Sequence, residues 1–95
     1  GCHLSHVYRD GACLYFTMVA MPSSEVEAVT TLGGWWQEGM KACLEAGGTI
    51  SHHHGIGRMR ARWLPDELGP WLDVLRGVKK VIDPHGIMNP GALGL

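Results

Sequence analysis

Gly-Gly-Thr-Ile-Ser-His-His-His-Gly-Ile-Gly-Arg-Met-Arg occupies residues 47–60, and the rest of the chain is organised around this stretch. Three adjacent imidazoles lie between paired glycines on one side and alternating glycines on the other, and arginines follow at once. Imidazole exchanges protons near neutral pH and binds metals in its neutral form. Glycine permits positive φ and a close approach of a ligand to the backbone. We therefore interpret the stretch as an active-site segment.

The backbone conformation of this segment decides which side chains can act together. In an extended chain successive side chains point to opposite faces. His52 and His54 would then share one face while His53 pointed away, so at most two of the three could address one ligand directly.

The arginines that follow depend on conformation in the same way. In an extended chain Arg58, Arg60 and Arg62 would form a line of guanidiniums suited to phosphate or carboxylate. If a helix begins here instead, Arg58 and Arg62 would stack one turn apart and Arg60 would diverge.

Other interpretations of these residues stay open. The histidines could decorate a surface or come from a tag, although a tag would be longer and terminal. They could bind zinc together with Cys2, His3 and His6, but no Cys-x-x-Cys or His-x-x-x-His pair sets two ligands at an established spacing. The glycines also begin a dinucleotide fingerprint, but Arg60 stands where the third glycine belongs, and no Gly-Lys-Ser/Thr follows.

The composition indicates a folded piece of a longer protein. Of 95 residues, 45% are hydrophobic and 18% are charged, which favours folding over disorder. The four tryptophans suggest surfaces that pack against something further. Because the chain begins without methionine or a leader, we expect a fragment. The net charge of −1 excludes a general electrostatic surface for nucleic acid.

The cysteines and the hydropathy bear on where the protein works. Cys2, Cys13 and Cys43 are odd in number and irregularly spaced, which suits free thiols in a reducing compartment. No apolar run reaches the roughly 18 residues that a membrane span needs. We expect a soluble, cytoplasmic protein without a transmembrane segment.

The first part of the chain predicts a strand pair. After the Asp10-Gly11 turn, residues 12–21 are almost continuously apolar, which predicts a strand buried on both faces or central in a sheet. Residues 3–8 are its expected neighbour. Tyr15 shares a face with Cys13, where its phenol could reach a pocket, although spacing alone favours a core tyrosine with a satisfied hydroxyl.

Helices dominate the remainder. Serine and glutamate at residues 24–27 resemble a capping box and predict a helix to about residue 46, which the glycines at 47–48 would end. Gly33-Gly34 inside it predicts a kink or a close helix contact. Residues 49–51 should form a short strand leading to the histidines. A helix should open at Leu64-Pro65, break at Gly69-Pro70 and continue over 71–82, before a tail of turns.

Two stretches carry a resemblance to a known family. They are Ser-His-His-His-Gly-Ile-Gly at 51–57 and Asp-Pro-His-Gly-Ile-Met-Asn-Pro-Gly at 83–91. Together they resemble the C-terminal end of FAD-linked oxidases of the vanillyl-alcohol oxidase type. The triple histidine, with Gly-Ala-Cys-Leu-Tyr-Phe at 11–16, is similar to the alkylglycerone-phosphate synthase branch. Glycolate and D-lactate dehydrogenases of the family usually have Gly-Glu-His-Gly where this chain has residues 52–55.

The resemblance implies an α+β fold and a division of the chain. Residues 1–62 would be the C-terminal part of a substrate (cap) domain, with a mixed or antiparallel sheet covered by helices. Residues 63–95 would be a terminal helix and tail that return to an upstream FAD-binding domain. That domain would bind most of the FAD, and Asn89 would contribute from the tail.

The resemblance also implies roles for site residues. Tyr15 would handle a proton of a keto-phosphate substrate, and His52, His53 and His54 would be the histidine cluster that the synthase needs. In that reaction acyl is exchanged for alkyl on dihydroxyacetone phosphate through a flavin adduct, which demands proton removal beside a carbonyl.

Several expectations remain coarser. From charge alone we expect Arg58 and Arg60 to bind the substrate phosphate. The tail at 87–91 is closer to a bacterial oxidase pattern, so the alternative is an FAD-linked dehydrogenase or oxidase of a 2-hydroxy acid or alcohol. An alternative of another class is a histidine-based metal-binding or interaction module; our own expectation includes no metal. The sequence allows a homo-oligomer, and we expect these 95 residues alone to be inactive.

Overall fold

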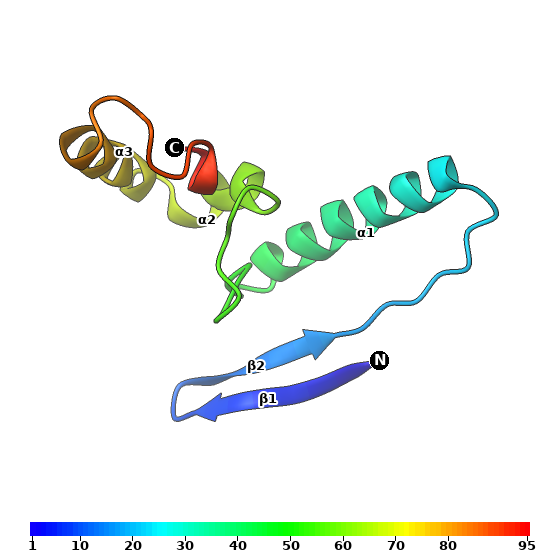
Figure 1. Ribbon diagram of the computed structural model, residues 1–95. Helices are drawn as coiled ribbons and strands as arrows, with labels where there is room; N and C mark the ends of the chain where they lie inside the picture. Colours follow the sequence, from blue (N-terminus) through cyan, green and yellow to red (C-terminus); the bar gives the residue numbers. More distant parts are fainter. The chain divides into compact units, whose positions relative to one another are not determined.

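The computed structural model describes residues 1–95, which form two compact units, residues 1–38 and residues 39–95. Strands and helices together make an α+β chain, as predicted (Figure 1). The predicted boundary at residue 62, between cap and FAD-side parts, stays a prediction. The elements in chain order are β1 (Cys2–Tyr8), β2 (Gly11–Phe16), α1 (Glu25–Glu45), the 3-10 turn η1 (Ala61–Trp63), α2 (Leu64–Leu68), α3 (Trp71–Ile82) and the 3-10 turn η2 (Ala92–Gly94).

β1 and β2 pair antiparallel into a two-stranded sheet, which confirms the predicted strand pair. Tyr8 lies opposite Gly11 at the turn. His6 is an extra residue in β1 with a φ of 51°, and beyond it the pairing shifts so that His3 lies opposite Tyr15. Such a bulge bends the strand and re-aims its side chains.

The predicted strand over residues 12–21 is too long. β2 ends at Phe16, Thr17 still exchanges two backbone hydrogen bonds with Gly1 (2.9 and 2.8 Å), and residues 17–21 belong to no strand. The expected burial on both faces is also wrong for this chain, since Phe16 is 64% exposed and Val19 82% exposed. The run has the composition of a central strand, yet a two-stranded ladder leaves much of its apolar surface open.

α1 forms as predicted, with both ends closed by local bonds. The backbone N–H of Glu27 donates to Ser24 Oγ (3.2 Å), and the Glu27 carboxylate accepts from the N–H of Ser23 (2.7 Å). At the other end Gly47 takes a φ of 74°, and Gly48 N–H donates to the Cys43 carbonyl (2.9 Å). The helix runs unbroken through residues 33–34, and no atom lies within 4 Å of a Cβ built there, so the predicted kink or close contact is wrong.

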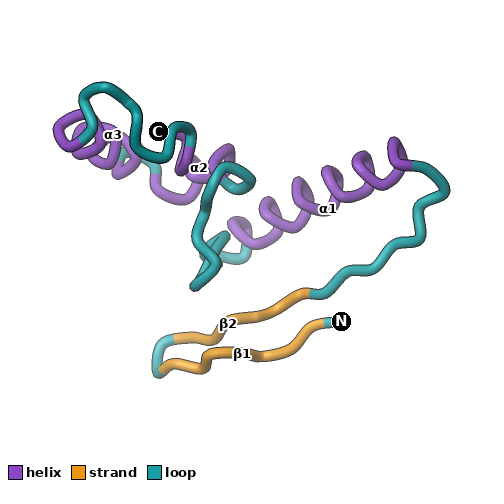
Figure 2. The backbone as a smooth tube through the Cα atoms, viewed as in Figure 1, coloured by secondary structure: helices purple, strands orange, loops and turns teal.

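The second unit packs around a small core of buried side chains: Ile50, Trp63, Leu64 and Leu72. Both predicted helices are present as α2 and α3, which pack against each other, and η1 packs against α2 and η2. Long loops precede η1 and follow α3, whereas only Gly69 and Pro70 separate α2 from α3 (Figure 2). No helix of the chain has both the length and the apolar character for crossing a membrane.

The expected strand at residues 49–51 is absent, and the segment is irregular. The N–H of Ile50 donates to the carboxylate of Glu67 (3.0 Å) rather than to a neighbouring strand. A side chain thus satisfies the backbone group that a ladder would otherwise have paired.

The tail after α3 is turn-rich, as predicted, and is organised by Asp83, the one buried charged residue. Its carboxylate accepts from the N–H groups of Ile87 and Met88 (both 3.0 Å) and pairs with Lys79. The hydrogen bond from Lys79 and the two backbone N–H groups hold the pKa of Asp83 below its usual range, against an opposing effect of burial.

Candidate functional site

Residues 51–55 form a closed loop, the histidine loop, that carries the three imidazoles. Ser51 Oγ donates to the carbonyl oxygen of Gly55 (2.9 Å), and Gly55 turns the chain with a φ of 74°. Nη1 of Arg60 donates to the same carbonyl (2.6 Å). These bonds fix the base of the loop, while His52, His53 and His54 are exposed.

The three rings contact one another in sequence. Nδ1 of His52 lies 2.9 Å from Nδ1 of His53, and the ring centroids of His53 and His54 are 4.3 Å apart. The expectation that His53 points away from its neighbours is therefore wrong, because the segment is bent rather than extended. In the bond between His52 and His53 one nitrogen donates and the other accepts, so at least one of the two Nδ1 atoms carries no proton.

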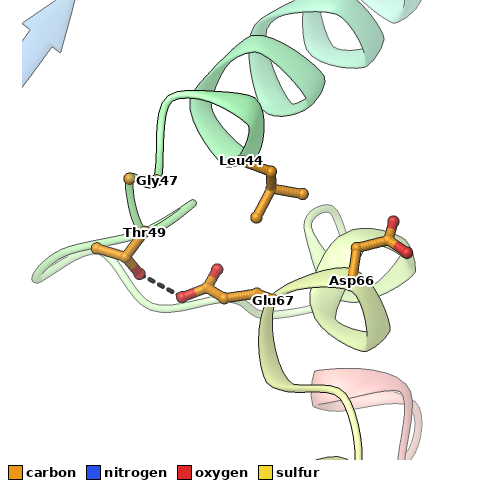
Figure 3. Close-up of a pocket in the computed structure, with 6 residues that line it drawn as sticks. Leu44, Gly47, Thr49, Asp66 and Glu67 are labelled. Atoms are coloured by element: carbon orange, nitrogen blue, oxygen red, sulfur yellow. Dashed lines mark hydrogen bonds between the residues drawn. The ribbon is translucent and has the colours of Figure 1, made fainter.

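The chain just before the histidine loop is held by two helices. Sγ of Cys43, in α1, donates to the carbonyl of Thr49 (3.3 Å). From α2, Glu67 accepts from Thr49 Oγ1 (2.5 Å) and from Ile50 N–H (3.0 Å), as Figure 3 shows for the threonine. Burial, and then the charge of Glu67, raises the pKa of the Cys43 thiol.

The contacts of Glu67 with Thr49 and Ile50 are called the anchor. A cavity of about 360 Å³ adjoins them (Figure 3). Reasoning from the sequence missed Glu67 as part of the site, because an acid in the first turn of a short helix is explained by the helix dipole alone. No local signal relates residue 67 to residue 49. The cavity is lined by Leu44, Gly47, Gly48, Thr49, Asp66 and Glu67.

The arginines form neither of the two arrangements considered from the sequence. Nη2 of Arg58 donates to the carbonyl of Pro90 in the tail (2.6 Å), whereas Arg60 bonds at the base of the histidine loop. The guanidinium of Arg62 stacks 3.9 Å from the ring centroid of Trp63. A guanidinium has five N–H donors, so the bond to Pro90 leaves Arg58 further donors for a substrate. Substrate binding by Arg58 and Arg60 stays a prediction.

Tyr15 lies on β2 in the first unit, 44% exposed. Its ring centroid lies 5.2 Å from that of His3, its partner across the sheet. Counting back from the turn pair Tyr8 and Gly11 would place Leu4 opposite Tyr15, and the bulge at His6 brings His3 there instead. His3 is thus a second candidate site residue beside Tyr15. The position of the turn alone would not have identified it.

Asn89 lies in the tail with a positive φ of 46°, a conformation that asparagine tolerates better than most residues. Its carbonyl accepts from Ala92 N–H (3.1 Å), and its side chain is exposed. The tail is tied to the segment after the histidine loop by Arg58 and by a bond from Leu93 N–H to the Gly57 carbonyl (2.9 Å). The structure thereby joins the two stretches that carry the resemblance.

Comparison with known proteins gives a consistent family. The model of the family described as FAD linked oxidases, C-terminal domain, matches residues 1–93. Alkyldihydroxyacetonephosphate synthase of Trypanosoma brucei brucei is 38% identical over 94 residues, covering 98% of this chain and 15% of that relative. An uncharacterized FAD-linked oxidoreductase of Escherichia coli (strain K12) is 35% identical over 99 residues, covering 98% and 20%.

A third relative carries a different activity in its name. D-lactate dehydrogenase of Anaerostipes hadrus is 46% identical over 50 residues, covering 52% of this chain and 10% of that protein. The chain thus spans at most a fifth of the length of these relatives. No solved structure matches it.

Proposed function

The chain belongs to the family of FAD-linked oxidases through their C-terminal domain, and from this premise we propose that it is the substrate-side part of an alkyl transferase. The transferase would exchange acyl for alkyl on dihydroxyacetone phosphate. One observation carries the proposal: the histidine loop presents three imidazoles in successive contact on a base closed by Ser51 and Arg60. The identity to a synthase over nearly the whole chain supports the same reaction.

FAD is the cofactor of this family, and the residues of this chain fit its ring rather than its pyrophosphate. The N-terminus of α1 carries Glu25 and Glu27, and that of α3 carries Asp73, charges that disfavour a phosphate. The exposed imidazoles and the amide of Asn89 are suitable hydrogen-bonding groups for a heteroaromatic edge. When bound, FAD supplies an electrophilic, electron-accepting ring. An upstream FAD domain remains part of the proposal.

The chain's own residues then supply proton transfer. In the hydrogen bond between neutral His52 and His53, the imidazole that donates through Nδ1 keeps an unprotonated Nε2, and this nitrogen can take a proton from the carbon beside the substrate carbonyl. Its neighbours can return a proton to the departing carboxylate. The phenol of Tyr15 is the second proton-handling group, and the arginines Arg58 and Arg60 supply positive charge for the phosphate.

The test uses the full-length protein with FAD. We expect it to form an ether lipid precursor from acyl-dihydroxyacetone phosphate and a long-chain alcohol, with release of fatty acid and no net reduction of an added dye. Product is measured by mass spectrometry. If no ether product forms while a D-2-hydroxy acid reduces the dye, the transferase proposal fails.

The second candidate is an FAD-linked dehydrogenase or oxidase of a 2-hydroxy acid or alcohol. It is favoured by the identity to a D-lactate dehydrogenase over about half of the chain. Here an imidazole of the histidine loop would remove the hydroxyl proton. Dye reduction with D-lactate supports this candidate, and ether formation opposes it.

A further inference from the structure

We infer that Glu67 is a positioning residue for the histidine loop: it fixes the two residues that precede the loop and so sets where the imidazoles stand. The inference rests on the proposed function, since it assigns Glu67 a role at the same site. Glu67 itself would touch neither substrate nor cofactor.

The geometry of the carboxylate supports this role. Its two oxygens accept separately, Oε1 from Thr49 Oγ1 (2.5 Å) and Oε2 from Ile50 N–H (3.0 Å). One rigid group therefore holds a side chain and a backbone donor of consecutive residues, which fixes both the position and the rotation of the chain there. Figure 3 shows the Glu67 side chain directed at Thr49, with the Asp66 side chain directed elsewhere.

The surroundings make this anchor stiff. Ile50 is 4% exposed, and Glu67 lies in a helix that packs against both η1 and α3. Cys43 bonds the Thr49 carbonyl from α1, and a Cβ at Gly48 would lie 2.9 Å from its sulfur. The chain entering the histidine loop is thus confined from two helices.

The location makes the anchor relevant to chemistry. Ile50 is separated from His52 by Ser51 alone, and the loop's other supports, Ser51 and Arg60, act at its base. A displacement of about 1 Å can reduce a catalysed rate on the order of a hundredfold. Loss of the anchor should therefore reach the imidazoles without altering their own atoms.

A cation-binding role for Glu67 in the adjoining cavity is less well supported. Each carboxylate oxygen already accepts a hydrogen bond within the chain, although lone pairs remain on both. The other charged residue that lines the cavity, Asp66, directs its side chain elsewhere, so no second acidic ligand converges with Glu67 (Figure 3). Positioning explains the contacts that Glu67 makes without a second ligand.

The experiment compares Glu67→Ala, Glu67→Gln and the control Asp66→Ala in the full-length protein. We expect Glu67→Ala to lower kcat about ten- to a hundredfold with little change in KM. The amide of Glu67→Gln can accept from Ile50 N–H and donate to Thr49 Oγ1, which keeps its own bond to the Ser51 carbonyl (3.2 Å), so kcat should recover to within a few-fold. Asp66→Ala should match the wild type.

Two readouts do not depend on turnover. Hydrogen exchange should show faster exchange of the Ile50 amide in Glu67→Ala only, and ring signals of residues 52–54 should shift in the NMR spectrum of the same variant. An unchanged kcat in a folded Glu67→Ala variant overturns the inference. So does an inactive Glu67→Gln variant with a protected Ile50 amide, because charge rather than position would then matter.

If Glu67→Ala does not fold, Thr49→Val replaces it. This variant removes the bond to Glu67 and also the bond from Thr49 to the Ser51 carbonyl, and we expect roughly a tenfold lower kcat and shifted ring signals; a wild-type kcat overturns the inference. Failure of the proposed function can be told apart from failure of the positioning role. If the wild type turns over neither substrate, the proposed function fails, and the NMR comparison then tests the positioning role alone. Unmoved ring signals in Glu67→Ala or Thr49→Val overturn the positioning role.

Discussion

The hairpin of β1 and β2 and the histidine loop hold their candidate residues in different ways. In the hairpin Tyr15 is placed by a backbone ladder, and its partner is chosen by the bulge at His6. In the histidine loop almost every fixing bond uses a side chain, from Ser51, Arg60 or Glu67. The hairpin is mostly exposed, whereas the chain before the loop includes a buried residue.

This difference separates two kinds of sensitivity. A ladder tolerates most side-chain changes but is sensitive to any change of register. A loop fixed by side chains tolerates little at a few positions, and those positions lie far along the chain, as residues 49 and 67 do.

The largest effect should come from the tip of the histidine loop. We expect His53→Ala to lower turnover of the full-length protein by about 10²- to 10⁴-fold, the usual range for a lost proton-transfer group. Because the ring is exposed, the free energy of unfolding should change by less than about 0.5 kcal/mol. His85→Ala, an exposed imidazole in the tail, is the control and should keep full activity. Equal turnover in both variants would remove the loop from the mechanism.

Adding a methyl group at Gly48, beside the anchor, should cause the largest change in the free energy of unfolding. Gly48→Ala places a Cβ 2.9 Å from Cys43 Sγ and 3.2 Å from the Cys43 carbonyl, and should cost about 1–3 kcal/mol. Gly34→Ala, in the open part of α1, should instead stabilise by about 0.5–1 kcal/mol. Urea unfolding measures both. A neutral Gly48→Ala would mean that the entry to the loop is not confined.

The hairpin is tested at its bulge. His6 has a φ of 51°, which costs a side-chain-bearing residue roughly 1–2 kcal/mol. We expect His6→Gly to keep the register and relieve part of this cost. His6→Val should weaken the bulge and favour pairing of Leu4 with Tyr15. Nuclear Overhauser effects between the rings of His3 and Tyr15 report the register, and their persistence at full strength in His6→Val would contradict this account.

The smallest effect is confined to the tail. Because the pKa of Asp83 is lower in the folded chain than in the unfolded one, its contribution to stability is fully present above about pH 4. It is lost as the pH falls through the lowered value, since protonation then favours the unfolded tail. Exchange of the Ile87 and Met88 amides should speed up in that window. Asp83→Asn should show faster exchange at neutral pH and no acid transition; an acid transition that persists would assign it to another group.

Local sequence was sufficient where local bonds decide structure. The Ser-Glu pattern at 24–27 and the glycines at 47–48 correctly bounded α1, and apolar spacing correctly placed α3 over 71–82. Two motifs, at 51–57 and 83–91, were sufficient to identify the family, because family membership is recognised from residue identities and needs no tertiary structure. The domain boundary, the cytoplasmic location and the roles of the site residues stay predictions.

Sequence by itself determined the kind of chemistry available: three imidazoles, flanking glycines and following arginines in a member of an FAD-linked family. Only the tertiary structure decided that the loop is bent rather than extended, that His3 faces Tyr15 and that Glu67 anchors Thr49. The physical reason is range. Helix propensity and capping act over about four residues. The strand bulge and the hydrogen bond from Thr49 to Glu67, 18 positions later, depend on contacts between distant residues, which a local sequence pattern does not contain.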